Sequence, residues 1–78
     1  MTTFNISLSS INSVKNFVNT VNRYDFDVDL ASGRYVVDAK SIMGIFSLDL
    51  SKPITLEAHC DDDSAERFKA DMKEFIVE

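Results

Sequence analysis

The sequence predicts an α+β protein built as a two-layer sandwich, with a four-stranded, mainly antiparallel sheet that carries three helices on one face. Two observations support this fold class. Apolar residues alternate with polar ones in some segments, which is typical of strands, and recur every three to four positions in others, which is typical of helices. The segments follow one another with short connections in the order strand, helix, strand, strand, short helix, strand, helix.

The chain begins with a predicted strand over residues 4–8, where Phe4, Ile6 and Leu8 alternate with polar neighbours. The period then changes to that of a helix. Ser9 or Ser10 is the expected N-cap, because a serine hydroxyl can accept a hydrogen bond from a free backbone N–H of the first turn. The apolar residues of this helix are Ile11, Val14, Phe17, Val18 and Val21.

A second strand is predicted over residues 25–30, with Phe26, Val28 and Leu30 buried. The alternating aspartates at 25, 27 and 29 are expected on a solvated sheet face. A calcium site is disfavoured, because its ligands must converge around a turn that contains a glycine. Residues 31–33 are a predicted tight reversal, and residues 34–38 form the returning strand of a hairpin.

Residues 41–46 are predicted to form a short helix, and residues 54–58 a fourth strand after the break at Pro53. The last helix is expected to begin in the acidic run at Asp61, with Asp63 and Glu66 spaced as in a capping box. Its predicted buried stripe is Ala65, Phe68, Met72, Phe75 and Ile76. Its predicted solvent-facing residues are Arg67, Lys69, Asp71, Lys73 and Glu74.

Composition limits the function classes. The 78 residues, 45% of them hydrophobic and 27% charged, are expected to form a single globular domain over residues 1–78. Thirteen acids against eight bases give a net charge of −5, which argues against nucleic acids and anionic membranes as partners and favours a protein partner. With one cysteine, no basic N-terminal start and no membrane-length apolar run, we expect a cytoplasmic protein.

One stretch is specific enough to indicate a family. The sequence Ala39-Lys40-Ser41-Ile42-Met43-Gly44, followed by Ser47-Leu48, together with the order of the elements, resembles the HPr family of small phosphocarriers in the bacterial sugar phosphotransferase system. It also resembles Crh, an HPr-like regulator without phosphocarrier chemistry. The resemblance covers essentially the whole chain and implies the open-faced HPr-like sandwich.

The resemblance implies a regulatory and docking surface. In this family the serine that matches Ser41 is phosphorylated by HPr kinase, and the apolar residues that match Ile42, Ile45 and Phe46 dock partner proteins. The partners implied are enzyme I, sugar permease components and a transcription regulator, the catabolite control protein. A new phosphoserine at a helix start would be met by free N–H donors and a positive dipole end. Ser41 as an N-cap alone is the simpler alternative.

The chain departs from the family at its phosphoryl-transfer site. HPr proteins carry a histidine at the start of the first helix, followed closely by an arginine and a proline, whereas this chain has Ser9-Ser10-Ile11-Asn12-Ser13 there. A serine phosphoester does not pass on its phosphoryl group as a phosphohistidine does, and the planar guanidinium that would hold the phosphoryl oxygens is absent. Ser10 and Asn12 are therefore predicted to contact a partner, beside the surface that begins at Ser41.

Other sites have weaker support. His59, the single histidine, is expected on the surface beyond the fourth strand, near residues 2–4 and away from the start of the first helix. Cys60 beside it is expected to be a buried or half-buried thiol, because two adjacent ligands do not make a zinc site. No nucleotide-binding, serine-hydrolase or zinc-protease motif occurs, so we predict no catalytic residue, no metal and no cofactor, and a protein that is not an enzyme.

Four functions follow from these observations. The first is an HPr-like regulatory or protein-binding protein without phosphohistidine transfer, with phosphorylation of Ser41 as a switch. The second is a divergent phosphocarrier that uses another acceptor such as His59. The third is an acyl carrier suggested by Asp63-Ser64-Ala65, which the alternating strands oppose because acyl carriers are helical bundles. The fourth is an HPr-fold interaction module unrelated to sugar transport, with the apolar surface making a homodimer; a monomer or weak dimer is expected.

Overall fold

The computed structural model describes residues 1–77 and has the predicted order of elements. The element bounds are β1 (Thr2–Ile6), α1 (Ile11–Val21), β2 (Val28–Ser32), β3 (Tyr35–Asp38), α2 (Ile42–Phe46), β4 (Ile54–Ala58) and α3 (Asp62–Asp71).

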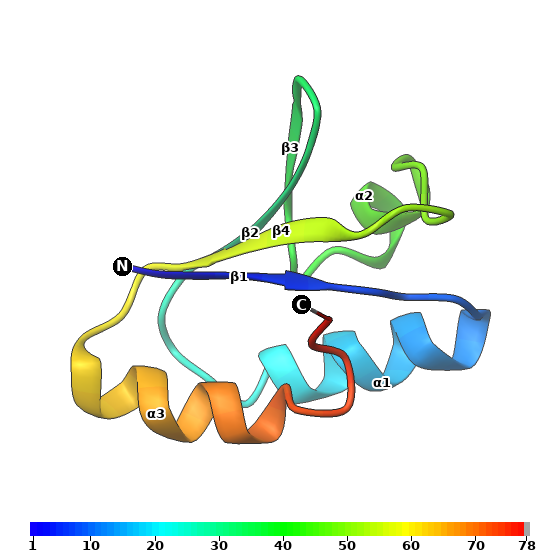
Figure 1. Cartoon of the computed structure of the whole chain (residues 1–78). Coiled ribbons are helices and arrows are strands. Elements are labelled where there is room, and N and C mark those ends of the chain that lie inside the picture. Colours follow the sequence, from blue (N-terminus) through cyan, green and yellow to red (C-terminus); the bar gives the residue numbers. More distant parts are fainter. Residues whose placement is uncertain (78) are drawn as a thin grey trace.

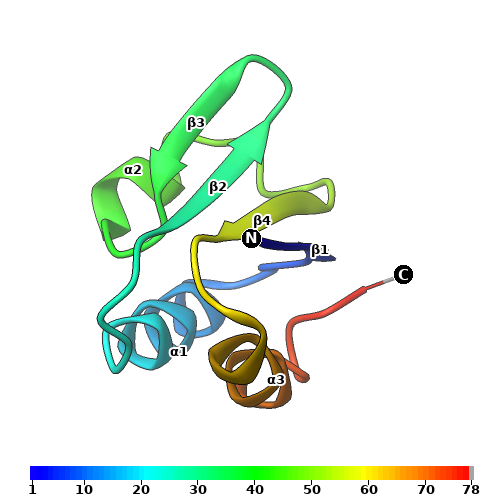
Figure 2. The ribbon, with the colours of Figure 1, turned by 90° about the vertical axis from the view of Figure 1, so that its left-hand side faces the viewer.

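The four strands form one sheet in the order β1-β4-β2-β3, and every neighbouring pair is antiparallel. The helices α1 and α3 lie side by side beneath one face of this sheet (Figure 1). The short helix α2 lies beside β3, at the end of the sheet farthest from β1 (Figure 2). The predicted α+β sandwich is therefore confirmed. Within residues 1–77, no helix has the length and apolar character needed to cross a membrane.

The core lies between the sheet and the helices. Strand β4 alternates as its sequence predicts: Ile54, Leu56 and Ala58 are buried, whereas Thr55 and Glu57 face the uncovered side. From α3, Phe68 is fully buried and packs edge-on against two aromatic rings of the loop before β2, Tyr24 and Phe26. Fully burying a side chain of this size contributes roughly 1.5–3 kcal/mol.

The hairpin between β2 and β3 turns later than predicted. Ser32 pairs with Tyr35, which leaves Gly33 and Arg34 as a two-residue loop instead of a reversal over residues 31–33. Gly33 has a φ of 60°, and a positive φ at the first loop position is the requirement of tight two-residue hairpin turns. The glycine therefore fixes the register of the hairpin.

Two strand boundaries differ from the prediction. Strand β1 begins at Thr2 and ends at Ile6, so that Leu8 is buried in the segment after the strand and not within it. Strand β2 begins only at Val28, and Asp25 and Asp27 precede it. In both cases the alternation of apolar and polar residues extends beyond the strand, after its end in β1 and before its start in β2. A side chain can be buried without its backbone pairing with a neighbouring strand.

The capping box predicted for α3 is wrong. Asp61 is the N-cap, and its side chain accepts a hydrogen bond of 2.8 Å from the backbone N–H of Ser64. The helix ends at Asp71, and Ile76, predicted on its buried stripe, instead forms a bridge with Ile6. The segment after α3 thus covers part of the outer edge of β1.

Candidate partner-binding and regulatory surface

Ser41 is the N-cap of α2. Its Oγ accepts a hydrogen bond of 3.2 Å from the backbone N–H of Gly44, and its carbonyl accepts one of 3.1 Å from Ile45. The helix starts here because Ser41 has an extended backbone and its hydroxyl satisfies a donor that the first turn leaves free. The side chain is half-buried. A phosphoryl group on this oxygen would replace the capping interaction and lie against the free N–H groups of the helix start.

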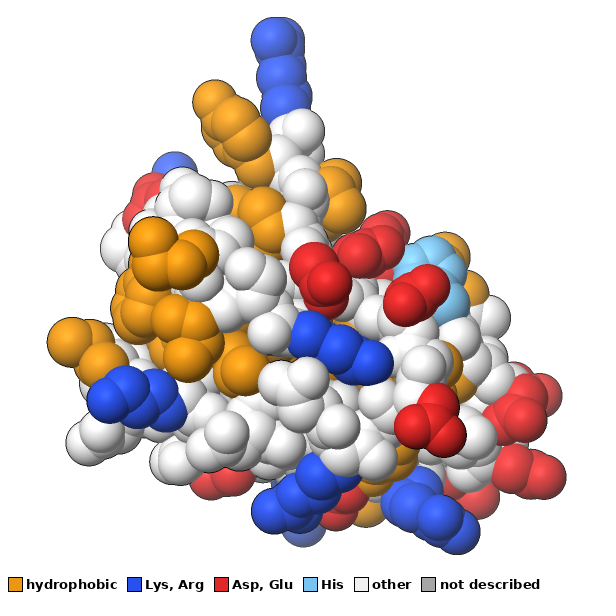
Figure 3. All heavy atoms as spheres, turned by 180° about the vertical axis from the view of Figure 1, so that it is seen from behind, with side chains coloured by type: hydrophobic (Ala, Val, Ile, Leu, Met, Phe, Trp, Pro, Cys, Tyr) orange, Lys and Arg blue, Asp and Glu red, His pale blue; other side chains and the backbone are white. Residues whose placement is uncertain are grey.

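An apolar patch lies next to Ser41. It consists of Ile42, Met43 and Phe46 of α2, which are 36%, 80% and 43% exposed, and Ile11 of α1, which is 62% exposed. Helices α1 and α2 are in contact, and hydrophobic side chains gather over this region on the face seen in Figure 3. So many large apolar side chains left open to water in one place indicate an interaction surface.

Ile45 does not belong to this patch. Its side chain is 0% exposed and lies in the core together with Leu48, so the expectation that it contacts a partner is wrong for this structure. Ile42 and Phe46 are one helical turn apart and share the outer side of α2, whereas Ile45 and Leu48 share the inner side. Spacing alone did not separate the two sides, because Ile45 is also about one turn from Ile42; packing on the core decides it. Met43, which the sequence analysis did not include among the contacts, is 80% exposed.

Gly44 lets α2 approach β3 closely. A Cβ atom at this position would lie 3.3 Å from the Cβ of Val37 on β3 and 3.4 Å from the Oγ of Ser41. The glycine in the middle of this short helix thus permits close packing on its inner side, while the outer side carries the apolar patch.

The first turn of α1 carries the other predicted contacts. Ser10, rather than Ser9, is the N-cap, with its Oγ 3.1 Å from the backbone nitrogen of Ser13, which donates to it. Ser10 and Asn12 are both exposed and flank Ile11 of the patch. The structure therefore brings Ser10, Asn12, Ile42 and Phe46 to the outside of two helices that contact each other.

His59 lies elsewhere. It follows β4, whose last residue, Ala58, pairs with Thr2 of β1, so His59 is at the opposite end of β1 from the start of α1. Its Nε2 is 3.0 Å from Oδ2 of Asp29, and its side chain is exposed as predicted. It lines an open cleft of about 340 Å³ together with three aspartates, Asp27, Asp29 and Asp38. Acidic side chains surround the histidine in Figure 3.

Cys60 is half-buried, and burial, followed by the nearby charge of Asp61, raises the pKa of its thiol. A raised pKa keeps the sulfur protonated and a poor nucleophile. Within residues 1–77, no three histidine, cysteine or acidic side chains are placed to hold a metal ion.

The fold and this surface define a small two-layer domain with an exposed apolar patch. The sequence matches the family described as "PTS HPr component phosphorylation site" over residues 11–78, and the chain belongs to this HPr family of the sugar phosphotransferase system. Proteins of this family are phosphocarriers, not enzymes, and interact with other proteins of that system. No curated protein sequence gives a significant match to the chain.

Solved HPr and Crh structures resemble the chain closely. HPr-C-His from Thermoanaerobacter tengcongensis has a TM-score of 0.75 and 28% identity, covering 95% of this chain and 92% of its own. The phosphocarrier HPr from Bacillus anthracis has a TM-score of 0.67 and 26% identity, with coverage of 90% and 94%. Crh from Bacillus subtilis, solved as a swapped, intertwined dimer, has a TM-score of 0.65 and 30% identity, with coverage of 94% and 88%.

Proposed function

We propose that this chain is a cytoplasmic, single-domain regulatory member of the HPr family that acts by binding phosphotransferase-system proteins and does not transfer phosphate through a histidine. The observation that carries the proposal is that the chain keeps the apolar patch and Ser41 but has a serine, Ser10, in place of the histidine that transfers phosphate in the family. The apolar patch and Ser41 match the family's docking and regulatory region, whereas Ser10 caps α1 where the family has its histidine.

Chemistry supports the loss of transfer. The hydroxyl of Ser10 acts as a helix cap and hydrogen bonds to Ser13. The single histidine, His59, is not near it, because His59 lies at the opposite end of β1 from the start of α1. A serine ester of phosphate is also a poor phosphoryl donor compared with the phosphoramidate of a histidine. Asn12 further lacks the charged, two-pronged donor that an arginine offers to phosphoryl oxygens.

The transfer reaction tests the proposal directly. Incubation with enzyme I and labelled phosphoenolpyruvate should leave the wild-type chain unlabelled, while an authentic HPr in the same tube becomes labelled. The double variant Ser10→His with Asn12→Arg should gain acid-labile label, because it restores the acceptor and its anion-binding partner. Stable transfer of label to the wild-type chain would overturn the proposal.

We also propose that phosphorylation of Ser41 switches the contact surface. A phosphoserine carries roughly −1.5 to −2 charge and would stand next to Ile42, at the margin of the apolar patch. Treatment with HPr kinase and ATP should add one phosphate to the wild-type chain and none to Ser41→Ala. Ser9→Ala, which leaves the cap of α2 intact, is the matched control and should be phosphorylated normally. Failure to modify the wild-type chain would leave the binding proposal without its switch.

A phosphocarrier that uses His59 is the second candidate, because Asp29 holds the imidazole and the ring is accessible. The surroundings oppose it. Three aspartates line the same cleft, and their negative charges would repel a phosphoryl group. Acid-labile phosphate that disappears in His59→Ala but persists in Ser10→Ala would establish this alternative.

A further inference from the structure

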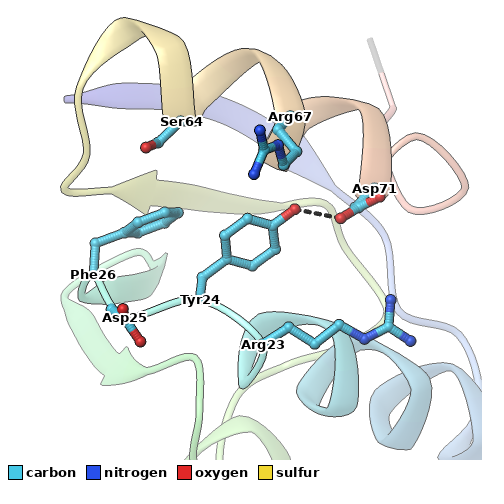
Figure 4. Close-up of a pocket in the computed structure, with 7 residues that line it drawn as sticks. All are labelled: Arg23, Tyr24, Asp25, Phe26, Ser64, Arg67 and Asp71. Atoms are coloured by element: carbon cyan, nitrogen blue, oxygen red, sulfur yellow. Dashed lines mark hydrogen bonds between the residues drawn. The ribbon is translucent and has the colours of Figure 1, made fainter.

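A second polar cleft lies away from the contact surface, between α3 and the loop that follows α1. Its volume is about 410 Å³, within the range of small-molecule sites. The loop contributes Arg23, Tyr24, Asp25 and Phe26, and the helix contributes Ser64, Arg67 and Asp71 (Figure 4). The cleft therefore combines two guanidinium groups, two aromatic rings and a hydroxyl with two carboxylates.

The two arginines of this cleft form no direct ion pair, although the carboxylates of Asp25 and Asp71 line the same cleft and balance their charge. Among residues 1–77, neither Arg23 nor Arg67 forms a salt bridge or a side-chain hydrogen bond. Arg67 and Asp71 are one turn apart on α3, where such residues commonly pair. Here Asp71 instead accepts a hydrogen bond from the hydroxyl of Tyr24, which leaves the guanidinium of Arg67 available.

The aromatic part of the cleft is held rigidly. The ring centroid of Tyr24 is 5.0 Å from that of the buried Phe68 and 5.3 Å from that of Phe26. The hydroxyl of Tyr24 donates a hydrogen bond to Asp71. Figure 4 shows Arg67 and Ser64 projecting from α3 toward these rings, while Asp25 points away from the helix. A bound molecule would thus meet a preformed aromatic wall, which lowers the cost of binding, whereas the exposed side chain of Arg67 would become ordered on binding.

We propose that this cleft binds a small organic anion in which a carboxylate or phosphate group is attached to a planar, apolar body. The guanidinium of Arg67 would bind the anionic oxygens in the two-pronged geometry that it offers. The rings of Tyr24 and Phe26 would receive the planar body. Because the cleft offers both a guanidinium group and aromatic rings, an inorganic anion alone, or an uncharged ring alone, would use only one of these two features.

Nuclear magnetic resonance of the full chain tests this proposal. Amide spectra would be recorded during titration with benzoate, phenyl phosphate, inorganic phosphate and benzyl alcohol. The two aromatic anions should produce saturable shifts confined to residues 23–26 and 64–71, with a dissociation constant on the order of 1 mM, as suits so small a ligand. Tighter binding of benzoate would assign a carboxylate as the anionic group, and tighter binding of phenyl phosphate would assign a phosphate.

Matched variants separate this site from general charge effects. Arg67→Gln should weaken binding of the aromatic anions by roughly ten- to a hundredfold, because a charged hydrogen-bond donor is lost. Lys69→Gln removes the same charge from an exposed position on the same helix outside the cleft and should bind normally. Absence of saturation with both aromatic anions, unchanged binding by Arg67→Gln, or equal binding of inorganic phosphate would overturn the proposal.

Discussion

At the scale of single residues, Ser41 has a structural role that can be measured apart from any phosphorylation. Its hydroxyl satisfies the backbone N–H of Gly44 at the start of a helix of five residues. Loss of an N-cap oxygen typically costs about 1 kcal/mol. The proposed phosphorylation would use the same oxygen atom as the cap, so a variant that removes this oxygen would affect both.

We expect Ser41→Ala to lower the free energy of unfolding by about 1 kcal/mol, measured by urea denaturation. Ser41→Asp should lose less, because aspartate is also a good N-cap and its charge suits the helix start. Ser9→Ala serves as the control, since Ser10 and not Ser9 caps α1. Equal stability of Ser41→Ala and wild type would show that the cap contributes nothing.

Tyr24 makes stability depend on pH in the alkaline range. Burial, and then its hydrogen bond to Asp71, raises the pKa of Tyr24 from 10.0 to about 12. Because the folded state holds the phenol proton more tightly than the unfolded chain, this contribution is complete below pH 10 and is lost as the pH rises through about 12.

Tyr24→Phe should therefore be less stable than wild type near neutral pH, by about 1 kcal/mol for the lost hydrogen bond. The difference should shrink between pH 10 and about 12, where the wild type loses its advantage. Tyr35→Phe is the matched control, because Tyr35 is exposed and its hydroxyl makes no hydrogen bond with residues 1–77. A stability difference for Tyr24→Phe that stayed constant across this range would contradict the assignment.

The candidate site could be predicted from the sequence only where its parts are local. Ser41, Ile42 and Phe46 lie within one short, specific stretch, but helical spacing did not separate the exposed Phe46 from the buried Ile45, because both are about one turn from Ile42. The cleft at Tyr24 could not be predicted in this way. Its Tyr24–Asp71 hydrogen bond joins residues 47 positions apart, and nothing in either segment specifies the other.

At the scale of the elements, the hairpin between β2 and β3 depends on one glycine. Gly33 has a φ of 60°, and nothing lies within 4 Å of the position that a Cβ would occupy. A side chain there would meet open space, so its cost arises only from the left-handed backbone.

Gly33→Ala should therefore destabilise the protein by about 1–2 kcal/mol, as measured by urea denaturation. Gly33→Asn should lose less, because asparagine tolerates this conformation better than other residues with a side chain. Equal losses for the two variants would contradict a cost that arises from the left-handed backbone.

The type and order of the elements were predictable because each segment has a clear hydrophobic period. Their ends were less so. The alternation around Phe26 continued outside the strand because this ring packs against Phe68 of α3. The start of α3 at Asp61 was predicted, whereas its end at Asp71, before Phe75 and Ile76, was not. The antiparallel β-bridge between Ile6 and Ile76 joins segments near the two ends of the chain, and no local sequence pattern predicts it.

At the scale of the whole molecule, two opposing terms decide whether the chain associates with itself. The apolar patch of Ile11, Ile42, Met43 and Phe46 favours burial against a second copy. The net charge of −5 on so small a molecule opposes it, because two like-charged copies repel each other at low ionic strength. A partner protein with a basic surface would instead be attracted by the negative charge of this chain and could bury the same apolar patch.

We therefore expect light scattering at low salt and micromolar concentration to give the mass of one chain, 8.8 kDa. Added salt should increase any self-association, because screening removes the repulsion and leaves the apolar term intact. Phe46→Asp should abolish that increase, whereas Tyr35→Ser, which removes an exposed ring on the hairpin outside the patch, should retain it. A dimer that is stable at low salt and insensitive to Phe46→Asp would show that copies associate through another surface, and would leave the patch free for a different protein.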